Sequence, residues 1–371
     1  MKKKKKIMVV FGTRPEAIKM APLILELKKY DMVELKICVT AQHREMLDQV
    51  LKLFEIEPDI DLNLMKHNQT LPDLTSNVLL KMDKVLKKER PDVLLIQGDT
   101  TTVMATALSA FYNNIDIGHV EAGLRSFNIK SPFPEEFNRK VVSLITKYHF
   151  VPTVRAKENL LKEGVKEENI YLTGNTVIDA LYYILKKPVP DYVTQLKNKI
   201  SKDSKIILVT AHRRENFGER FFSICQGIKK IVERNKEVTI IYPVHYNPNV
   251  REPVHSILKG IERVLLIEPV EYDVLVHLIN LSYLVLTDSG GIQEEAPSLG
   301  KPVLVLRTET ERPEGIEAGT AKLVGPYEDK IITETEILLH DNVEYNRMAK
   351  AINPYGDGKA SQRIVNILIN Q

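Results

Sequence analysis

Short runs of valine, isoleucine and leucine alternate with longer amphipathic stretches along this chain, in two separate series. A short apolar run followed by a longer stretch of helical periodicity is typical of a strand and its crossover helix in a parallel α/β sheet. Parallel strands need such crossovers because each strand must begin at the same edge of the sheet. The pattern therefore predicts an α/β protein with two Rossmann-like domains.

The positions of the apolar runs predict the strands and the domain boundary. The first series gives strands at 7–11, 35–39, 93–96, 117–120, 148–151 and 170–172. The second gives strands at 206–210, 238–242, 264–267, 284–286, 303–306 and 321–324. Residues 186–204 between them are polar, contain prolines and show no strand pattern. We expect domains at 1–174 and 175–357, with a final helix at about 358–371 that can pack back on the first domain.

Charge and length exclude several classes of protein. The chain has 371 residues, of which 43% are hydrophobic, and 52 basic against 49 acidic side chains give a net charge of only +3. A chain of this length and composition can bury two hydrophobic cores. The small net charge argues against a nucleic-acid partner. The lysine run at 2–6 favours a solvated tail over a targeting address or a membrane-surface patch. No stretch approaches the roughly eighteen apolar residues of a membrane span, so no membrane partner is expected.

The sequence contains no motif that indicates a cofactor or a metal. Cys38 and Cys225 are the only cysteines, which excludes a disulfide framework and a thiolate metal site and makes a reducing cytoplasm the expected location. A Walker loop is absent, no Gly-x-Gly-x-x-Gly follows a strand, and no His-x-x-x-His pair occurs. We therefore expect neither ATP hydrolysis nor tightly bound NAD.

A glycine-containing corner in the second series predicts a phosphate site. Thr287-Asp288-Ser289-Gly290-Gly291 follows an apolar run, and Glu294 and Glu295 lie one turn further on. Glycines at a strand-to-helix corner let backbone amides approach an anion, and Ser289 can donate another hydrogen bond. A glutamate that reaches past the phosphate to a ribose would favour a nucleotide ligand, which makes the second domain the nucleotide-binding one. The alternative, that the glutamates only suit the helix dipole, stays open.

Polar side chains follow other predicted strands directly, at the edge where open parallel sheets bind ligands. If the two sheets face each other, these corners line one cleft between the domains. Carboxylates, a histidine and arginines around a nucleotide site indicate acid–base chemistry on a nucleotide-linked substrate. The residues are Arg14, Lys19, Asp99, Glu121, His212 and Arg213.

Each of these residues also has a structural interpretation. Arg14 fits a surface position, Asp99 an N-cap, and His212 a solvated basic loop. Asp99 and Glu121 follow buried strands, where an unpaired carboxylate is costly, so together they favour function or a strong ion pair. Glu135-Glu136 follows two prolines that restrict the backbone and could present one glutamate rigidly, or it simply begins a helix.

Six motifs, in order along essentially the whole chain, resemble the non-hydrolysing UDP-N-acetylglucosamine 2-epimerases. They are Phe11-Gly12-Thr13-Arg14-Pro15-Glu16-Ala17, Gln97-Gly98-Asp99-Thr100, His119-Val120-Glu121-Ala122-Gly123-Leu124-Arg125, Pro134-Glu135-Glu136, His212-Arg213-Arg214-Glu215-Asn216, and Thr287-Asp288-Ser289-Gly290-Gly291-Ile292-Gln293-Glu294-Glu295. The resemblance implies a GT-B-like fold, a homodimer, and interconversion of UDP-N-acetylglucosamine with UDP-N-acetylmannosamine for cell-surface polysaccharide or glycoconjugate synthesis.

The mechanism implied by the resemblance is anti elimination of UDP to 2-acetamidoglucal, followed by re-addition. Direct deprotonation at C2 would face a forbidding barrier, because no adjacent carbonyl stabilises a carbanion, and no NAD site is seen. Epimerisation requires acid–base groups on both faces of the sugar. Asp99, Glu121 and Glu135 match the family's catalytic carboxylates, and His212 matches its histidine near the departing diphosphate.

The resemblance also implies a UDP site. Val270 and Leu275 stand where bacterial relatives carry a glutamine and a phenylalanine near uracil, so base recognition through backbone contacts is expected here. The implied UDP contacts are Arg14, Lys19, Arg213, Ser289, Gly290, Gly291, Glu295 and Arg312.

A second UDP-N-acetylglucosamine activates bacterial relatives, and four residues here resemble positions around that allosteric site. Glu45 and Asn68 replace a glutamine and an arginine often found there. Losing an arginine and gaining a carboxylate should weaken binding of an anionic effector, so weak or altered activation is expected. The four residues are Gln42, His43, Gln69 and His245.

Three alternative functions remain. A hydrolysing epimerase would release free N-acetylmannosamine and UDP, and a GT-B glycosyltransferase would need an acceptor. A nucleotide-sugar sensor would bind UDP and turn nothing over, but three matched carboxylates are superfluous for a binding protein.

Overall fold

The chain folds into two compact units. The computed structural model describes residues 4–40, 44–64 and 69–371. One unit comprises Met1–Tyr183 together with Tyr355–Gln371, and the other comprises Ile184–Pro354. This division leaves most of helix α7 (Thr176–Leu185) in the first unit, whereas a boundary at residue 174 places it in the second.

The first unit is built on a parallel seven-stranded sheet with the order β3-β2-β1-β4-β5-β6-β7. The outermost strands of the sheet pair over only a few residues, β3 with β2 on one side and β7 with β6 on the other. The strands are β1 (Lys5–Phe11), β2 (Val33–Val39), β3 (Ile60–Asp61), β4 (Val93–Gln97), β5 (Asp116–Val120), β6 (Tyr148–Val151) and β7 (Ile170–Leu172).

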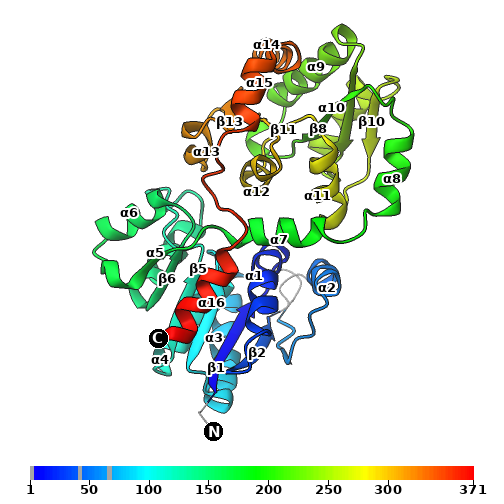
Figure 1. Ribbon diagram of the computed structural model, residues 1–371. Helices are drawn as coiled ribbons and strands as arrows, with labels where there is room; N and C mark the ends of the chain where they lie inside the picture. Colours follow the sequence, from blue (N-terminus) through cyan, green and yellow to red (C-terminus); the bar gives the residue numbers. More distant parts are fainter. Residues whose placement is uncertain (1–3, 41–43, 65–68) are drawn as a thin grey trace. The chain divides into compact units, whose positions relative to one another are not determined.

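Helices cover both faces of this sheet, as all-parallel sheets require. The remaining helices of the unit are α1 (Arg14–Leu27), α2 (Arg44–Leu53), α3 (Leu71–Glu89), α4 (Thr101–Tyr112), α5 (Glu135–Ile145), α6 (Val154–Lys162) and α16 (Ala360–Asn370), with a short 3₁₀ helix, η1, at Glu167–Asn169. Met8 and Val10 of β1 pack into one core with α3 and α4. On the other side α16 lies beside α1, so the end of the chain returns to the domain in which it began (Figure 1).

The second unit repeats the design with a parallel six-stranded sheet of order β10-β9-β8-β11-β12-β13. Its strands are β8 (Lys205–Thr210), β9 (Val238–Pro243), β10 (Val264–Ile267), β11 (Leu284–Thr287), β12 (Val303–Val305) and β13 (Ala321–Leu323). Successive residues of β8 point to opposite faces: Ile207 and Val209 join one core, and Ile206 and Leu208 join the other. Such burial on both faces explains why its strands read as continuous apolar runs.

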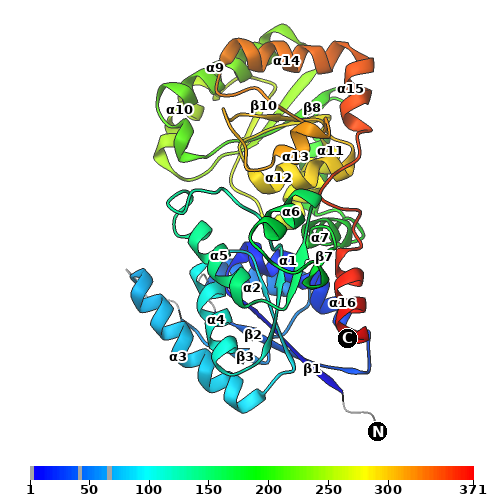
Figure 2. The same ribbon diagram turned by 90° about the vertical axis from the view of Figure 1, so that its left-hand side faces the viewer.

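Two layers of helices enclose this second sheet (Figure 2). α9 (Glu219–Arg234), α10 (Pro248–Leu258) and α14 (Glu328–His340) cover one face, and α8 (Asp191–Asn198) and α11 (Tyr272–Leu281) cover the other. The shorter helices of the unit are α12 (Gly290–Glu295), α13 (Pro313–Glu317) and α15 (Asn342–Ala349), with 3₁₀ helices η2 (Arg214–Asn216) and η3 (Ala296–Leu299).

All twelve predicted strands are present within two residues of their expected ends. The sequence missed β3, which has only two residues and is too short to show a periodicity. The stretch 186–204 contains no strand, as expected, but it does contain helix α8.

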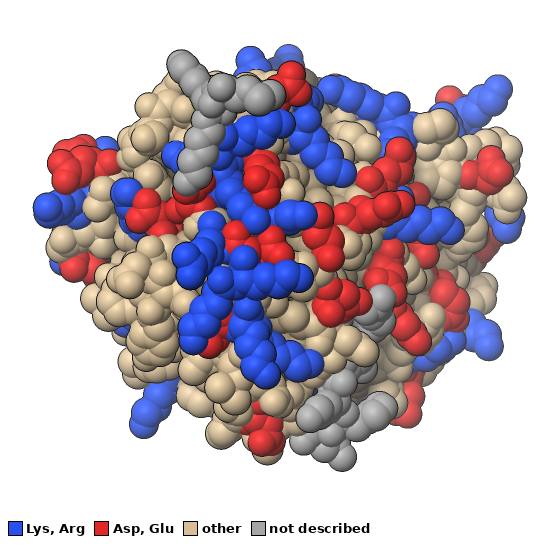
Figure 3. Space-filling view, turned by 90° about the horizontal axis from the view of Figure 1, so that it is seen from below, with Lys and Arg blue, Asp and Glu red and all other residues tan. Residues whose placement is uncertain are grey.

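The lysine run at the start of the chain is not wholly a solvated tail, and the expectation was wrong for Lys5 and Lys6. Both belong to β1. Lys5 Nζ donates a hydrogen bond to the carbonyl of Leu368 (2.7 Å), and Lys6 Nζ lies 2.9 Å from Glu89 and 3.2 Å from Glu34. Figure 3, which views the molecule from the bottom of Figure 1, shows basic and acidic side chains interspersed on that side. Lys5 and Lys6 therefore have partners within the fold.

Candidate active site

The carboxyl edge of the first sheet brings the predicted carboxylates together. The register of β1, β4 and β5 places the ends of these strands side by side, with Gln97 opposite Val120. Arg14 begins helix α1 just after β1, and the loops after β4 and β5 carry Asp99 and Glu121. The expectation that these residues share one sheet edge is confirmed.

Asp99 is held by an arginine that sequence reasoning did not single out. Arg139 of α5 directs two nitrogens at Asp99 Oδ2, with Nε at 2.9 Å and NH2 at 2.7 Å. Asn138 donates from Nδ2 to the carbonyl of Asp99 at 2.8 Å. The N-cap of α4 is Thr100, whose hydroxyl accepts from the Val103 amide, so the N-cap interpretation of Asp99 is wrong. These two contacts from Arg139 hold the Asp99 side chain in a fixed orientation.

Glu121 is also paired with a cation. Its carboxylate contacts Lys19 Nζ and accepts a hydrogen bond from Asn175 Nδ2 at 3.1 Å. Its backbone has φ of +65°, a left-handed conformation that is uncommon for a residue other than glycine. Such a conformation persists only where the surroundings enforce it, and it often marks a functional site. The lysine expected to contact UDP therefore lies against a predicted catalytic carboxylate.

Glu135 and Glu136 begin helix α5 and have different surroundings. Glu136 is fully buried, and its carboxylate accepts the amides of Ser126 (3.0 Å) and Phe127 (3.1 Å) and contacts Arg139 (3.2 Å). Among the described residues, Glu135 Oε2 is buried without a hydrogen-bond partner. Glu136 thus anchors the preceding loop, and Glu135 retains an acceptor for a ligand. The helix-start interpretation is confirmed, and the rigid presentation of one glutamate to a substrate stays a prediction.

Glu16 is a structural residue of this edge that sequence reasoning missed. Its Oε2 accepts the amides of Gly12 (2.7 Å) and Thr13 (3.0 Å), and its Oε1 accepts the Thr100 hydroxyl (2.7 Å). Burial raises the pKa of this carboxyl, while the backbone and hydroxyl donors oppose the rise. The Thr-x-x-Glu capping box at the start of α1 was the available signal. Glu16 ties the start of α1, where Arg14 lies, to the loop of Asp99.

The carboxyl edge of the second sheet holds the glycine corner and the His212 loop. β8 and β11 end together, with Thr210 opposite Thr287 and their hydroxyls 2.7 Å apart. Ser289 is the N-cap of α12, so Gly290 and Gly291 form the first turn. Neither glycine has a positive φ, and a Cβ on Gly290 would meet only the Arg312 guanidinium, at 3.9 Å. The corner therefore presents free space beside a cation, which suits an anion.

Glu294 and Glu295 lie at the end of α12 rather than in its first turn, so the helix-dipole alternative is wrong. Both are buried. Glu294 is paired with Arg312, and Glu295 Oε1 accepts a hydrogen bond from the Tyr272 hydroxyl at 2.6 Å. Glu294 thus positions Arg312 at the corner, and Glu295 stays near it, with its Oε2 3.8 Å from a Cβ built on Gly291.

The predicted allosteric residues are only partly open to structural description. Gln42 and His43 lie outside the described residues, as does Asn68. Gln69 is half-buried and precedes Thr70, the N-cap of α3. His245 stacks on His212, with ring centroids 5.4 Å apart and an interplanar angle of 15°. His245 therefore contacts a residue predicted to be catalytic.

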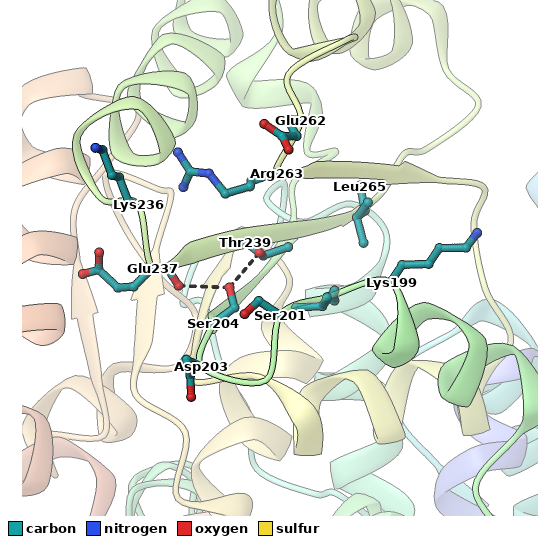
Figure 4. Close-up of a pocket in the computed structure, with 11 residues that line it drawn as sticks. Lys199, Ser201, Asp203, Ser204, Lys236, Glu237, Thr239, Glu262, Arg263 and Leu265 are labelled. Carbon is teal, nitrogen blue, oxygen red and sulfur yellow. Dashed lines mark hydrogen bonds between the residues drawn. The ribbon is translucent and has the colours of Figure 1, made fainter.

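A cavity of about 550 Å³ lies elsewhere in the second unit (Figure 4). The residues that line it lie near the amino-terminal ends of β8, β9 and β10. These ends are at the sheet edge opposite the glycine corner. Three of its lining side chains form hydrogen bonds within the unit: Ser204 Oγ contacts the Glu237 carbonyl (2.9 Å) and Thr239 Oγ1 (2.7 Å), and Arg263 donates to backbone carbonyls. No predicted site residue lines it.

Within the described ranges, no group of three or more histidine, cysteine, aspartate or glutamate side chains is arranged to hold a metal ion. The helices described there include none long and apolar enough to cross a membrane.

Comparison with known proteins decides the family. The family model of UDP-N-acetylglucosamine 2-epimerase matches residues 25–369. The chain belongs to this family. The UDP-N-acetylglucosamine 2-epimerase of Bacillus subtilis (strain 168) is 54% identical over 367 residues, which cover 99% of this chain and 96% of the relative.

Solved structures of epimerases match the whole chain. The Neisseria meningitidis UDP-GlcNAc 2-epimerase bound to UDP-GlcNAc is 50% identical, with a TM-score of 0.91 and coverage of 99% of this chain and 100% of that one. The Methanocaldococcus jannaschii enzyme in complex with UDP-GlcNAc and UDP is 37% identical, with a TM-score of 0.80 and the same coverage. The epimerase fold predicted for this chain, α/β and GT-B-like, is thereby confirmed.

Proposed function

We propose that this protein interconverts UDP-N-acetylglucosamine and UDP-N-acetylmannosamine without hydrolysing them. The observation that carries the proposal is the set of cation-paired carboxylates at one sheet edge, in a chain related to 2-epimerases along its whole length. Two of the three predicted catalytic carboxylates already have a fixed cationic partner, and the third has a buried free acceptor. A protein that only binds UDP has no use for such an arrangement.

The reaction proceeds by anti elimination and re-addition. A base removes the C2 proton as the C1–oxygen bond to UDP breaks, which gives 2-acetamidoglucal and UDP. UDP then adds back to C1, and an acid delivers a proton to the opposite face of C2. Asp99, Glu121 and Glu135 supply the acid–base groups, each contributing on the order of 10²- to 10⁴-fold. Lys19 and Arg139 hold two of them in place.

Cationic side chains and the glycine corner hold the leaving UDP. Arg213 and Arg312 neutralise the diphosphate, the corner amides donate to it, and His212 contacts it as charge develops. Glu295, positioned by Tyr272, accepts from the ribose hydroxyls. The corner residues are Ser289, Gly290 and Gly291, and Arg14 and Lys19 add positive charge.

Assembly, location and regulation follow the family expectation. We propose a cytoplasmic homodimer that serves cell-surface polysaccharide or glycoconjugate synthesis and responds weakly to a second UDP-N-acetylglucosamine. Exposed apolar side chains on neighbouring helices support association: Leu80 on α3, Phe111 on α4 and Leu144 on α5 are 65%, 52% and 83% exposed. A monomer in light scattering at micromolar concentration would contradict the dimer.

Product analysis tests the reaction against its alternatives. Pure protein is incubated without acceptor or cofactor, starting from each UDP-sugar epimer in separate tubes, and the products are separated by anion exchange. The proposal predicts the same epimer ratio from both directions, with both sugars still linked to UDP. Free N-acetylmannosamine with stoichiometric UDP would indicate the hydrolysing type, and turnover only with an added acceptor would indicate a glycosyltransferase.

A further inference from the structure

Asp288, at the end of β11, is a buried carboxylate that organises the loop of His212. Its side chain is fully buried. Oδ2 accepts hydrogen bonds from the backbone amides of His212 (2.9 Å) and Arg213 (2.8 Å) and from Asn216 Nδ2 (3.2 Å). Asn216 in turn donates to the carbonyl of Leu306 at 3.0 Å. One carboxylate oxygen therefore fixes the backbone that carries His212.

The second oxygen of Asp288 faces the imidazole. Among the described residues, Oδ1 is buried and has no hydrogen-bond partner. Its nearest ionisable neighbour is His212 Nδ1, at 3.9 Å, about 1 Å beyond hydrogen-bond distance. A buried charged acceptor without a donor is costly, so a small movement that brings Nδ1–H onto it is favourable.

The surroundings of His212 shift the pKa of its imidazole in both directions. Partial burial lowers the pKa of the imidazole, Asp288 raises it, and His245 and Arg213 lower it further. The His212 side chain is still 42% exposed, so a ligand can reach the imidazole. A bound diphosphate would add negative charge on that side and, with Asp288 behind the ring, would favour the imidazolium.

We propose that Asp288 is a positioning residue for His212. Oδ2 fixes the loop, and Oδ1 accepts the hydrogen bond of Nδ1–H, so that Nε2–H points outward to an oxygen of the nucleotide diphosphate. This inference rests on the proposed function of His212 as a diphosphate contact. It assigns the aspartate of the glycine corner to the histidine, and leaves Ser289 and the two glycines for the phosphate.

The direct test is NMR of His212 in the full protein labelled with ¹⁵N and ¹³C histidine, with UDP as the probe ligand. The ring signals are assigned with His212→Asn. With UDP bound, the proposal predicts that Nδ1 is protonated and hydrogen-bonded, and that Asp288→Asn lowers the pKa of His212. A UDP-bound imidazole with an unprotonated Nδ1 would overturn the proposal, and this observation needs no Asp288 variant to fold.

A matched control separates this effect from a general change of charge. Glu215→Gln removes a carboxylate from the same loop, but Glu215 is paired with Arg307 at 2.7 Å rather than with His212. It should leave the His212 pKa unchanged. An equal change in both variants would contradict a specific role for Asp288.

A double-mutant cycle gives the kinetic readout. Asp288→Asn should lower kcat about 10- to 100-fold, with KM changed by less than about threefold. In a His212→Asn background, Asp288→Asn should cause no further loss, because it acts through the histidine. Independent, multiplying losses would overturn the inference. If His212→Asn itself leaves kcat unchanged, the proposed role of His212 fails instead, so the two failures are distinguishable.

Discussion

The two sheets share the strand order 3-2-1-4-5-6, counted along each unit, and the first adds β7 at one edge, but their carboxyl edges carry different chemistry. In each sheet the first strand of the unit lies in the interior, and later strands are added on both sides of it. The connecting loops leave the sheet at the carboxyl ends of the strands. The first edge carries carboxylates paired with Arg139 and Lys19. The second carries backbone amides, a histidine and arginines, and its buried aspartate is used within the loop. The shared scaffold provides an edge, and the loop residues alone determine that one edge suits proton transfer and the other suits an anion.

The largest expected effect tests the acid–base assignment of the first edge. Asp99→Asn removes the charge with little change of shape and should lower kcat about 10²- to 10⁴-fold while UDP affinity stays the same. Steady-state kinetics measure kcat, and calorimetry measures the affinity for UDP. Asp116→Asn is the matched control, because Asp116 lies at the start of β5, on the opposite edge, and pairs only with exposed Lys147 among the described residues. An Asp99→Asn protein with ordinary turnover would remove this residue from the catalytic set.

The next effect concerns the cation behind Asp99. Arg139→Lys keeps the charge but cannot reproduce the two-nitrogen contact, so Asp99 loses its fixed orientation. We expect kcat to fall about 10- to 100-fold with little change in KM. Lys140→Met on the same helix is the control, since Lys140 is exposed and contacts only Glu163 among the described residues, at 3.5 Å. Equal activity of both variants would show that Arg139 has no positioning role.

A contrasting effect is expected at the second edge. Arg213→Met should weaken UDP binding and raise KM about 10-fold, consistent with the loss of one charge-assisted hydrogen bond, with a smaller change in kcat. Its neighbour Arg214 is exposed and was not predicted to contact UDP, so Arg214→Met should behave like the wild type. If Arg213→Met changed kcat alone, the division between a proton-transfer edge and an anion edge would be wrong.

The last prediction concerns the amino edge of the first sheet, where an ion pair is expected to affect the free energy of unfolding but not turnover. Hydrogen bonding to Lys6 lowers the pKa of Glu89 below its ordinary value of 4.5. The pair therefore stabilises the fold above that pH, and the contribution is lost as pH falls through the lowered pKa. Glu89→Gln should cost about 0.5 to 1 kcal/mol at neutral pH, measured by denaturant unfolding, without affecting turnover.

The pH dependence provides the control for this pair. The difference in stability between wild type and Glu89→Gln should shrink on acidification, whereas Glu57→Gln, at an exposed position, should cost little at any pH. A difference that grows with acid would contradict the lowered pKa.

The sequence predicted the strands and the loops that carry the site, because apolar periodicity fixes where each parallel strand ends. It did not predict side-chain direction across the edge. Lys19 was predicted to contact UDP, which stays a prediction, but its pairing with Glu121, 102 residues away in the chain, was not predicted. Arg139 and Asp288 were missed as partners because a helix position and a corner aspartate have many local interpretations, and only the folded register shows which atom each one faces.

In the proposed reaction, C2 loses and regains a proton as UDP leaves and returns. UDP-N-acetylglucosamine is incubated with the pure protein in deuterated water, with no added cofactor, and the sugar is followed by NMR. Elimination and re-addition predict UDP-N-acetylmannosamine with deuterium at C2. UDP-N-acetylmannosamine that keeps protium at C2 would contradict it, because the hydrogen would then have moved without exchange with solvent.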